Sequence, residues 1–230
     1  ESLNISTFQA GDLVINEIMY SLEGLDTNRE WVEIYNNSGY AITLVGGMSG
    51  WRFYDGSSNR IFKEPIAQGS MTIEPGVYFI LTNLADSATD FFDDRPGFSG
   101  TVIDTSISLR NSTSTLKIIT PDGAIIDEVT YYNFWGADGN GKTLERKSAT
   151  GGSNDSQNWA ESSVNGGTPG AANNWEVATS TSSISETIPS PTATSSVSEI
   201  LGLGTDVSAT KTISGDTTWI LAGSPYRLFF

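Results

Sequence analysis

Short segments of alternating apolar and polar residues, separated by turn residues, restrict the fold of this chain most. Residues 30–36, EWVEIYN, alternate Trp31 and Glu33 with Val32 and Ile34. A period of two residues predicts a half-buried β-strand. Similar segments recur with Gly, Pro and Asn between them, and no long stretch has a strong helical period. This spacing predicts an all-β, antiparallel sandwich or barrel.

Residues 12–20 show the same pattern, and strict alternation puts Ile15 and Glu17 on one face with Asn16 and Ile18 on the other. Residues 84–95 are the one place where a short helix or turn is expected, with its two phenylalanines pointing inward. Further strands are expected within residues 41–47, 50–55 and 71–83, in a hairpin over 114–132 that turns at Pro121-Asp122-Gly123, and in a short strand over 143–148.

Composition removes several classes of chemistry. The chain has no His and no Cys, which excludes disulfides, zinc–thiolate sites and every Ser–His or Cys–His arrangement. Its net charge is -15 with only 12 Lys and Arg, so it repels phosphate backbones and no nucleic-acid partner is expected. No apolar run approaches the ~18 residues that cross a bilayer.

The sequence predicts three parts. Residues 10–175 form the β-sandwich, and residues 176–206, rich in Ser, Thr and Pro, form a linker. Residues 207–230 are β-like again, and they are either the truncated start of a further β domain or strands that dock on the sandwich. The chain opens at Glu1 without a signal peptide, so we expect a mature or excised fragment of a longer protein.

Charged residues of the strands offer a catalytic and a structural interpretation. Glu17, Glu30 and Glu33 lie in predicted strands, and two carboxylates held ~5–10 Å apart can hydrolyse a glycoside. Nothing in the sequence marks a cleft, so the structural interpretation is favoured. Arg146 is expected to pair with one of these glutamates or to stay solvated. The acidic group Asp86, Asp90, Asp93 and Asp94 is expected to be solvated surface rather than a cation-binding loop.

The loop sequence ADGNGKTLER resembles the start of a calcium loop. Asp138 and Asn140 take the first and third ligand positions, but Lys142, Thr143 and Ala149 do not fit positions five, six and twelve. Asp-Gly and Asn-Gly are also the best dipeptides for tight turns. We therefore expect a turn, and keep Asp138 and Asn140 as the candidate metal ligands. No cofactor is expected apart from calcium at these two residues.

The tryptophans suggest stacking on a sugar or peptide, or packing in the core. Trp31 and Trp51 lie in strand patterns, so we expect both in the core. Trp159 is expected to pin the C-terminal segment to the sandwich. Trp135, beside a glycine, is the best candidate for an exposed aromatic side chain.

Several motifs follow one another along the chain: VINEIMY (14–20), EWVEIYNNSGYAITLVGG (30–47), GWRFYDG (50–56), IEPGVYFILTN (73–83), ISLRNSTSTLKIITPDGAIIDEVTYYN (107–133), ADGNGKTLERKS (137–148) and NDSQNWAESSVNGGTPGAANN (154–174). In this order, over residues 12–174, they resemble the lamin tail domain family in its bacterial, secreted branch. The resemblance implies an immunoglobulin-like β-sandwich that acts as a binding or structural module, attached to secreted or surface proteins and often beside hydrolase or nuclease domains. A weaker likeness, over residues 213–228, is to the lead-in of a surface repeat domain.

The sequence therefore predicts a non-catalytic interaction, adhesion or spacer module of a larger secreted or cell-surface bacterial protein. The alternative is an accessory domain that targets a secreted hydrolase or nuclease and binds calcium. The expected partners are an unidentified protein or surface polymer and further domains of the same parent chain.

Overall fold

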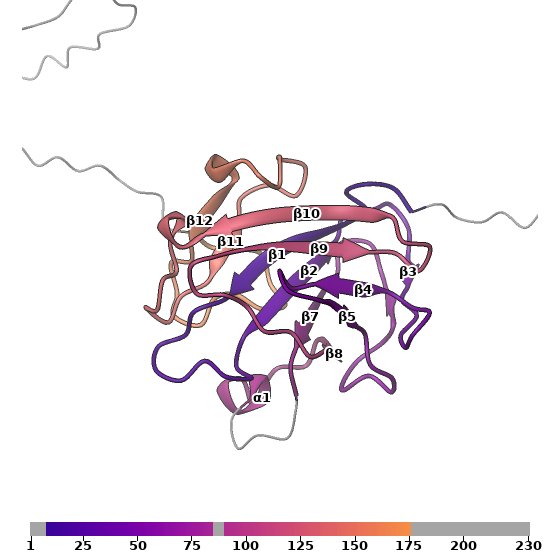
Figure 1. Cartoon of the computed structure of the whole chain (residues 1–230), viewed down its shortest axis with the longest axis horizontal. Coiled ribbons are helices and arrows are strands. Elements are labelled where there is room, and N and C mark those ends of the chain that lie inside the picture. Colours follow the sequence, from indigo (N-terminus) through magenta and orange to yellow (C-terminus); the bar gives the residue numbers. More distant parts are fainter. Residues whose placement is uncertain (1–7, 85–89, 176–230) are drawn as a thin grey trace, which may run out of the picture. The chain divides into compact units, whose positions relative to one another are not determined.

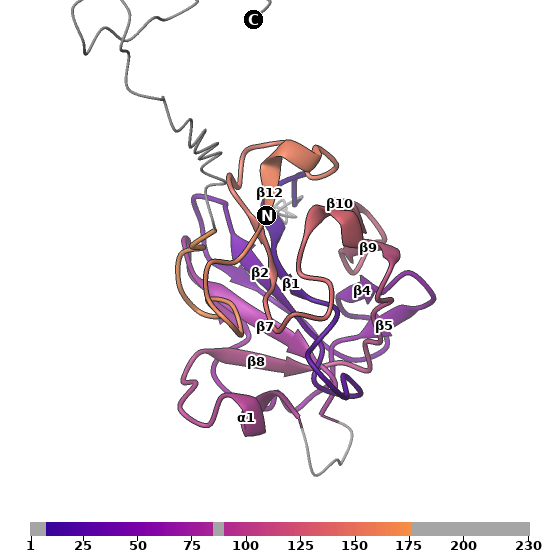
Figure 2. The ribbon, with the colours of Figure 1, turned by 90° about the vertical axis from the view of Figure 1, so that its left-hand side faces the viewer.

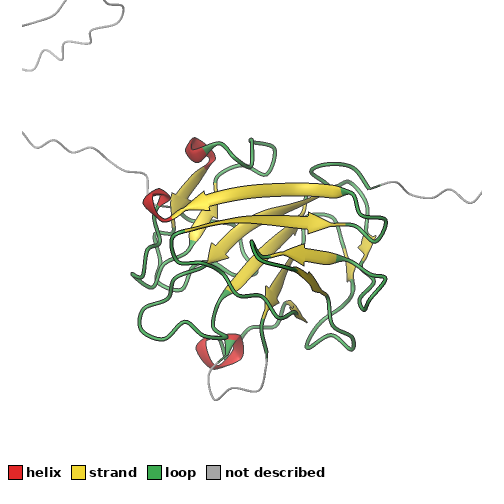
Figure 3. Ribbon diagram, viewed as in Figure 1, coloured by secondary structure: helices red, strands yellow, loops and turns green. Residues whose placement is uncertain are grey.

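The computed structural model describes residues 8–84 and 90–175, and over these residues the chain is almost entirely β (Figures 1 and 3). The all-β prediction is confirmed. The predicted linker 176–206 and the predicted segment 207–230 lie outside the described residues. The strands are β1 (Leu13–Met19), β2 (Trp31–Asn36), β3 (Ile42–Thr43), β4 (Arg52–Tyr54), β5 (Asn59–Ile61), β6 (Thr72–Ile73), β7 (Tyr78–Thr82), β8 (Thr101–Asp104), β9 (Thr113–Ile119), β10 (Ile125–Tyr132), β11 (Leu144–Arg146) and β12 (Trp159–Glu161).

Two sheets pack face to face in this part of the chain. The larger sheet has the order β12-β11-β1-β2-β7-β8, and the smaller has the order β10-β9-β4-β5, while β3 and β6 form a short pair. All pairings are antiparallel except β7 with β8. The predicted hairpin over 114–132 is β9–β10, and the predicted strand over 143–148 is β11.

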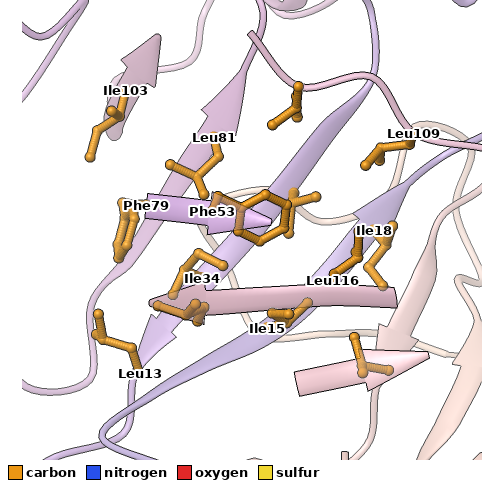
Figure 4. Packing of buried hydrophobic residues seen from close by; sticks show 14 of the residues in the cluster. Leu13, Ile15, Ile18, Ile34, Phe53, Phe79, Leu81, Ile103, Leu109 and Leu116 are labelled. Carbon is orange, nitrogen blue, oxygen red and sulfur yellow. The ribbon is translucent and has the colours of Figure 1, made fainter. Parts of the chain in front are cut away.

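The core fills the space between the sheets (Figure 4). Ile15, Ile34 and Phe79 of the larger sheet meet Phe53 and Leu116 of the smaller one, and all five are fully buried. Burying a side chain of this size contributes roughly 1.5–3 kcal/mol relative to leaving it in water. Repetition of such residues on one face of each strand holds the two sheets together.

A β-bulge in β1 interrupts the alternation of side chains that was predicted for residues 12–20. The register of β1 against β2 shifts between Ile15 and Glu17, so Ile15 and Ile18 both face the core. The extra residue sends Asn16 and Glu17 to the outer face of the larger sheet. The prediction that Ile15 and Glu17 share a face is therefore wrong.

The outer face of the larger sheet is also buried, so the prediction of half-buried strands is wrong for β1 and β2. One part of this face carries Trp31, which packs edge-on against Phe91 at a centroid distance of 5.9 Å. Phe91 opens the single α-helical turn α1 (Phe91–Asp94), capped by Asp90. The short helix expected within 84–95 is present, with Phe91 buried and Phe92 partly buried.

Two 3-10 turns, η1 (Asn133–Trp135) and η2 (Ser156–Asn158), complete the regular structure of the described residues. Among the helices in residues 8–84 and 90–175, none is long and apolar enough to cross a membrane.

Candidate functional site

Three glutamates lie side by side on the outer face of the larger sheet. Glu17 of β1 is the cross-strand partner of Glu33 on β2 and of Glu145 on β11. All three side chains are 0% exposed. Because cross-strand partners have Cβ atoms about 4.5–5.5 Å apart, the three carboxyl groups form one buried acidic cluster. Of the three glutamates that the sequence suggested, this cluster includes Glu17 and Glu33 but not Glu30.

Residues 162–175, called the strap below, cover this cluster (Figure 2). The backbone N–H of Thr168 donates to Glu17 Oε1 at 2.8 Å. The N–H of Gly170 donates to Glu33 Oε2 at 2.5 Å, and the N–H of Asn174 donates to Glu145 Oε2 at 2.7 Å. Each glutamate thus holds one backbone amide of the strap.

Side chains bind the remaining carboxyl oxygens. Glu33 Oε1 accepts from Asn16 Nδ2 at 2.8 Å, and Glu145 Oε1 accepts from Thr168 Oγ1 at 3.0 Å. Thr168 Oγ1 also lies 3.5 Å from Glu17 Oε2. The Thr168 hydroxyl has one hydrogen, which it donates to Glu145, so a protonated Glu17 is the donor in the 3.5 Å contact. In this arrangement every oxygen of the cluster has a hydrogen-bond partner, as buried polar groups require.

The strap sequence suits this close approach. Gly167 has a φ of 72°, and a Cβ added there would lie 1.9 Å from Glu17 Oε1. Only glycine fits such a position. The side chain of Asn173 adds bonds to the backbone oxygens of Asn16 at 3.1 Å and Arg146 at 2.7 Å. The Gly-rich strap therefore does more than turn the chain, because its backbone N–H groups donate to buried acids.

Burial governs the acidity of the cluster. Desolvation raises the pKa of Glu17 to about 8, although bonds from Thr143 and Thr168 oppose the rise. Desolvation, with the neighbouring charge of Glu17, raises the pKa of Glu33 well above its usual range. Groups that lie under a strap, with all their oxygens bonded, have no room for a sugar and an attacking water between them. The geometry gives no support to the glycosidase interpretation.

Glu30 lies apart from the cluster. Its Oε2 accepts the N–H of Leu109 at 3.0 Å. Burial raises its pKa to about 8, and the nearby charges of Asp26 and Asp55 act in the same direction. The sequence alone could not separate Glu30 from Glu33, because the bulge and the strap decide which glutamates meet.

Arg146 pairs with Asp127 of β10, at 3.0 Å, and with none of the glutamates expected from the sequence. Both side chains hydrogen-bond to the backbone at the bulge in β1. Asp127 Oδ2 accepts the N–H of Ile15 at 2.7 Å, and Arg146 Nη1 donates to Ile15 O at 2.9 Å. The guanidinium also lies over the Trp159 ring at 5.7 Å. The sequence prediction missed Asp127 as the partner of Arg146. Asp127 follows two isoleucines in a strand and points inward.

Asp138 and Asn140 lie in a tight turn. Gly139 and Gly141, with φ values of 70° and 77°, make the turn. Asp138 accepts from Asn133 Nδ2 at 3.1 Å, and Asn140 donates to Glu161 Oε2 at 2.7 Å. Across residues 8–84 and 90–175, no three Asp, Glu, His or Cys side chains are grouped to hold a metal. A metal role for Asp138 and Asn140 stays a prediction.

The other acidic residues singled out from the sequence have local structural roles. Asp90 and Asp93 form the capping box of α1. Asp94 makes an ion pair with Arg29 at 2.8 Å. Asp86 lies outside the described residues.

An exposed aromatic surface, made of Tyr132, Phe134 and Trp135, lies where β10 runs into η1. Phe134 is 77% exposed and stacks on Tyr132 at a centroid distance of 5.0 Å. Trp135 is half-buried and stacks on the buried Trp159 at 6.4 Å. The sequence pointed to Trp135 as the exposed ring, whereas its neighbour Phe134 is more exposed. Trp31 and Trp51 are buried as expected.

Comparison with known proteins gives one match. The model of the Lamin Tail Domain family matches residues 6–133, more than half of the chain. No curated protein and no solved structure matches the chain. The matched region includes Glu17, Glu33 and the aromatic residue Tyr132, and it ends before Glu145 and the strap.

Proposed function

Because the chain belongs to the lamin tail domain family, we propose that it is a non-catalytic interaction module of a larger secreted or cell-surface protein. The family fold is an immunoglobulin-like sandwich, in agreement with the two packed sheets, and the predicted fold class is confirmed. The secreted setting rests on the likeness of the sequence motifs to the bacterial branch of the family.

One observation carries the non-catalytic part of the proposal. Glu17, Glu33 and Glu145 are cross-strand neighbours in the larger sheet, and each carboxyl group accepts a hydrogen bond from a backbone amide of the strap. A general acid or nucleophile must reach its substrate within hydrogen-bond distance. The hydrogen bonds of these carboxyl groups instead hold the strap against the outer face of the sheet.

The aromatic surface supports the interaction part of the proposal. Exposed aromatic rings are enriched in binding surfaces, because they bury much apolar area at little conformational cost. The net charge of -15 disfavours an anionic partner. We therefore expect Tyr132, Phe134 and Trp135 to contact a neutral or basic protein, or a neutral surface polymer.

A binding assay tests this proposal, in which fluorescently labelled protein comprising residues 1–230 is added to intact cells and to purified cell envelope of the source organism. We expect saturable binding that falls at least about tenfold in the Tyr132→Ser/Phe134→Ser variant, which corresponds to ~1.4 kcal/mol. Leu25→Ser is the matched control, since Leu25 is an apolar side chain that is 83% exposed elsewhere on the domain. Absence of binding by the wild type, or equal loss in the control, would contradict the proposal.

A further inference from the structure

The aromatic surface of Tyr132, Phe134 and Trp135 is the outer end of a continuous series of ring contacts. Phe134 stacks on Tyr132 at a centroid distance of 5.0 Å, and Tyr132 meets Trp135 at 5.7 Å. Trp135 in turn stacks on the buried Trp159 at 6.4 Å. The exposed rings therefore rest on rings that belong to the core, and Phe134, which is 77% exposed, lies outermost.

A cation already lies at the inner end of this series. The guanidinium of Arg146 lies over the Trp159 ring at 5.7 Å and pairs with Asp127 at 3.0 Å. Such contacts are favourable because the face of an aromatic ring carries partial negative charge. Within residues 8–84 and 90–175, no Lys or Arg takes the corresponding place on Phe134 or on the other rings of the aromatic surface.

The outer end also has a carboxylate beside it. Asp138 is exposed, and its Oδ2 accepts a hydrogen bond at 3.1 Å from Nδ2 of Asn133, the first residue of η1. Asp138 takes part in none of the ion pairs within the described residues, whereas Glu161, which binds the same turn, pairs with Lys142 at 3.2 Å. An unpaired negative charge at the rim of a binding surface favours a positively charged partner over an anionic one.

We propose that the aromatic surface binds a basic segment of a partner protein, with an Arg or Lys side chain on the exposed face of Phe134 and its charge compensated by Asp138. This inference rests on the proposed interaction function, because it names the chemistry of the partner. The net charge of -15 attracts a basic segment from a distance, and the ring and the carboxylate then fix where it binds. A neutral surface polymer would use the rings but gain nothing from Asp138.

Fluorescence anisotropy with a labelled peptide tests the proposal. The probe is a short peptide of alternating Arg and Gly, and its matched control carries citrulline in place of each Arg, which keeps the shape but removes the charge. At about 0.15 M salt, which screens the long-range attraction, we expect the protein comprising residues 1–230 to bind the Arg peptide saturably. The citrulline peptide should bind at least about tenfold more weakly, because it lacks every charged contact.

Variants at Phe134 separate cation binding from simple apolar contact. Phe134→Leu keeps an apolar side chain but removes the ring face, so the affinity for the Arg peptide should fall roughly two- to fivefold. Phe134→Trp should raise the affinity, since the indole ring binds cations best. A contact that was only apolar would not rank the three side chains in this order for the Arg peptide and leave the citrulline peptide bound weakly throughout.

Asp138→Asn tests the carboxylate and should weaken binding of the Arg peptide about two- to fivefold, as expected for an exposed ion pair. Glu74→Gln is its matched control, because it removes one exposed carboxylate before β7 and should leave the affinity unchanged.

Equal binding of the two peptides, an unchanged affinity in Phe134→Leu, or equal losses in Asp138→Asn and Glu74→Gln would overturn the proposal. Cell binding that needs Tyr132 and Phe134 but is not competed by the Arg peptide would also overturn it, while leaving the proposed function intact. Binding of the Arg peptide by a protein that does not bind cells would instead contradict the proposed function alone.

Discussion

At the scale of single residues, Gly167 shows how tightly the strap rests on the sheet. A methyl group added at this position would lie 1.9 Å from Glu17 Oε1 and 2.5 Å from Thr143 Oγ1, at a φ of 72°. We expect Gly167→Ala to lower the free energy of unfolding by about 2–4 kcal/mol, the sum of overpacking and backbone strain. Urea denaturation measures the change.

Gly24→Ala is the control for this substitution, because Gly24 also has a positive φ, 83°, but has no atom within 4 Å of the added Cβ. It should cost only about 1 kcal/mol of strain. Equal losses in the two variants would show that the strap does not press on Glu17.

The buried ion pair of Arg146 and Asp127 gives a second prediction for a single substitution. The Arg146 guanidinium is buried against Asp127 and satisfies the backbone freed by the bulge at Ile15. Removing one partner of a buried ion pair leaves an uncompensated charge, so Asp127→Asn should destabilise the fold by about 3–5 kcal/mol. In the partly exposed surface pair of Lys117 and Glu128, Glu128→Gln should cost less than about 1 kcal/mol. Similar losses in both variants, measured by urea denaturation, would refute the role of Arg146.

At the scale of elements, the strap makes stability depend on pH. The native pKa of Glu17, about 8, exceeds its usual value of 4.5. Between these values the folded state holds more protons than the unfolded state, so its stability falls as pH rises from about 4.5 to 8. We expect a lower urea midpoint at about pH 9 than at about pH 5.

Two variants test whether Glu17 causes this pH dependence of stability. Glu17→Gln keeps the hydrogen-bond acceptor but cannot ionise, so it should remove part of the fall in the midpoint. The exposed residue Glu74 lies away from the strap, and Glu74→Gln should leave the fall unchanged. A midpoint that rises with pH in the wild type would contradict the raised pKa of the cluster.

The strands themselves could be read from the sequence, because alternation and Pro-Gly or Asp-Gly turns are local signals. The hairpin β9–β10 and the turn at Gly139 followed from these signals. The bulge in β1 could not be predicted, because one inserted residue moves every later side chain to the opposite face of the strand and leaves no local signal in the sequence. The burial of Glu17 and Glu33 depends on contacts with the strap more than 130 positions away, which periodicity cannot reveal.

At the scale of the whole described domain, the strap gives the larger sheet a second covered face. Figure 2 shows the strap on one side of β1 and β2 and the smaller sheet on the other. Acidic side chains thereby stabilise the architecture, and the proposed partner contacts are assigned to the aromatic surface at the end of β10. This division is the basis on which we propose a non-catalytic module.

Native-state hydrogen exchange of the strap amides tests that account most directly. The backbone N–H groups of Thr168, Gly170 and Asn174 each donate to a buried glutamate. We predict that they exchange about 100-fold or more slowly than the N–H of Gly24 in an exposed loop, after correction for intrinsic rates. Exchange as fast as that of Gly24 would mean that the strap opens freely and the carboxyl groups meet solvent, which would contradict their structural assignment.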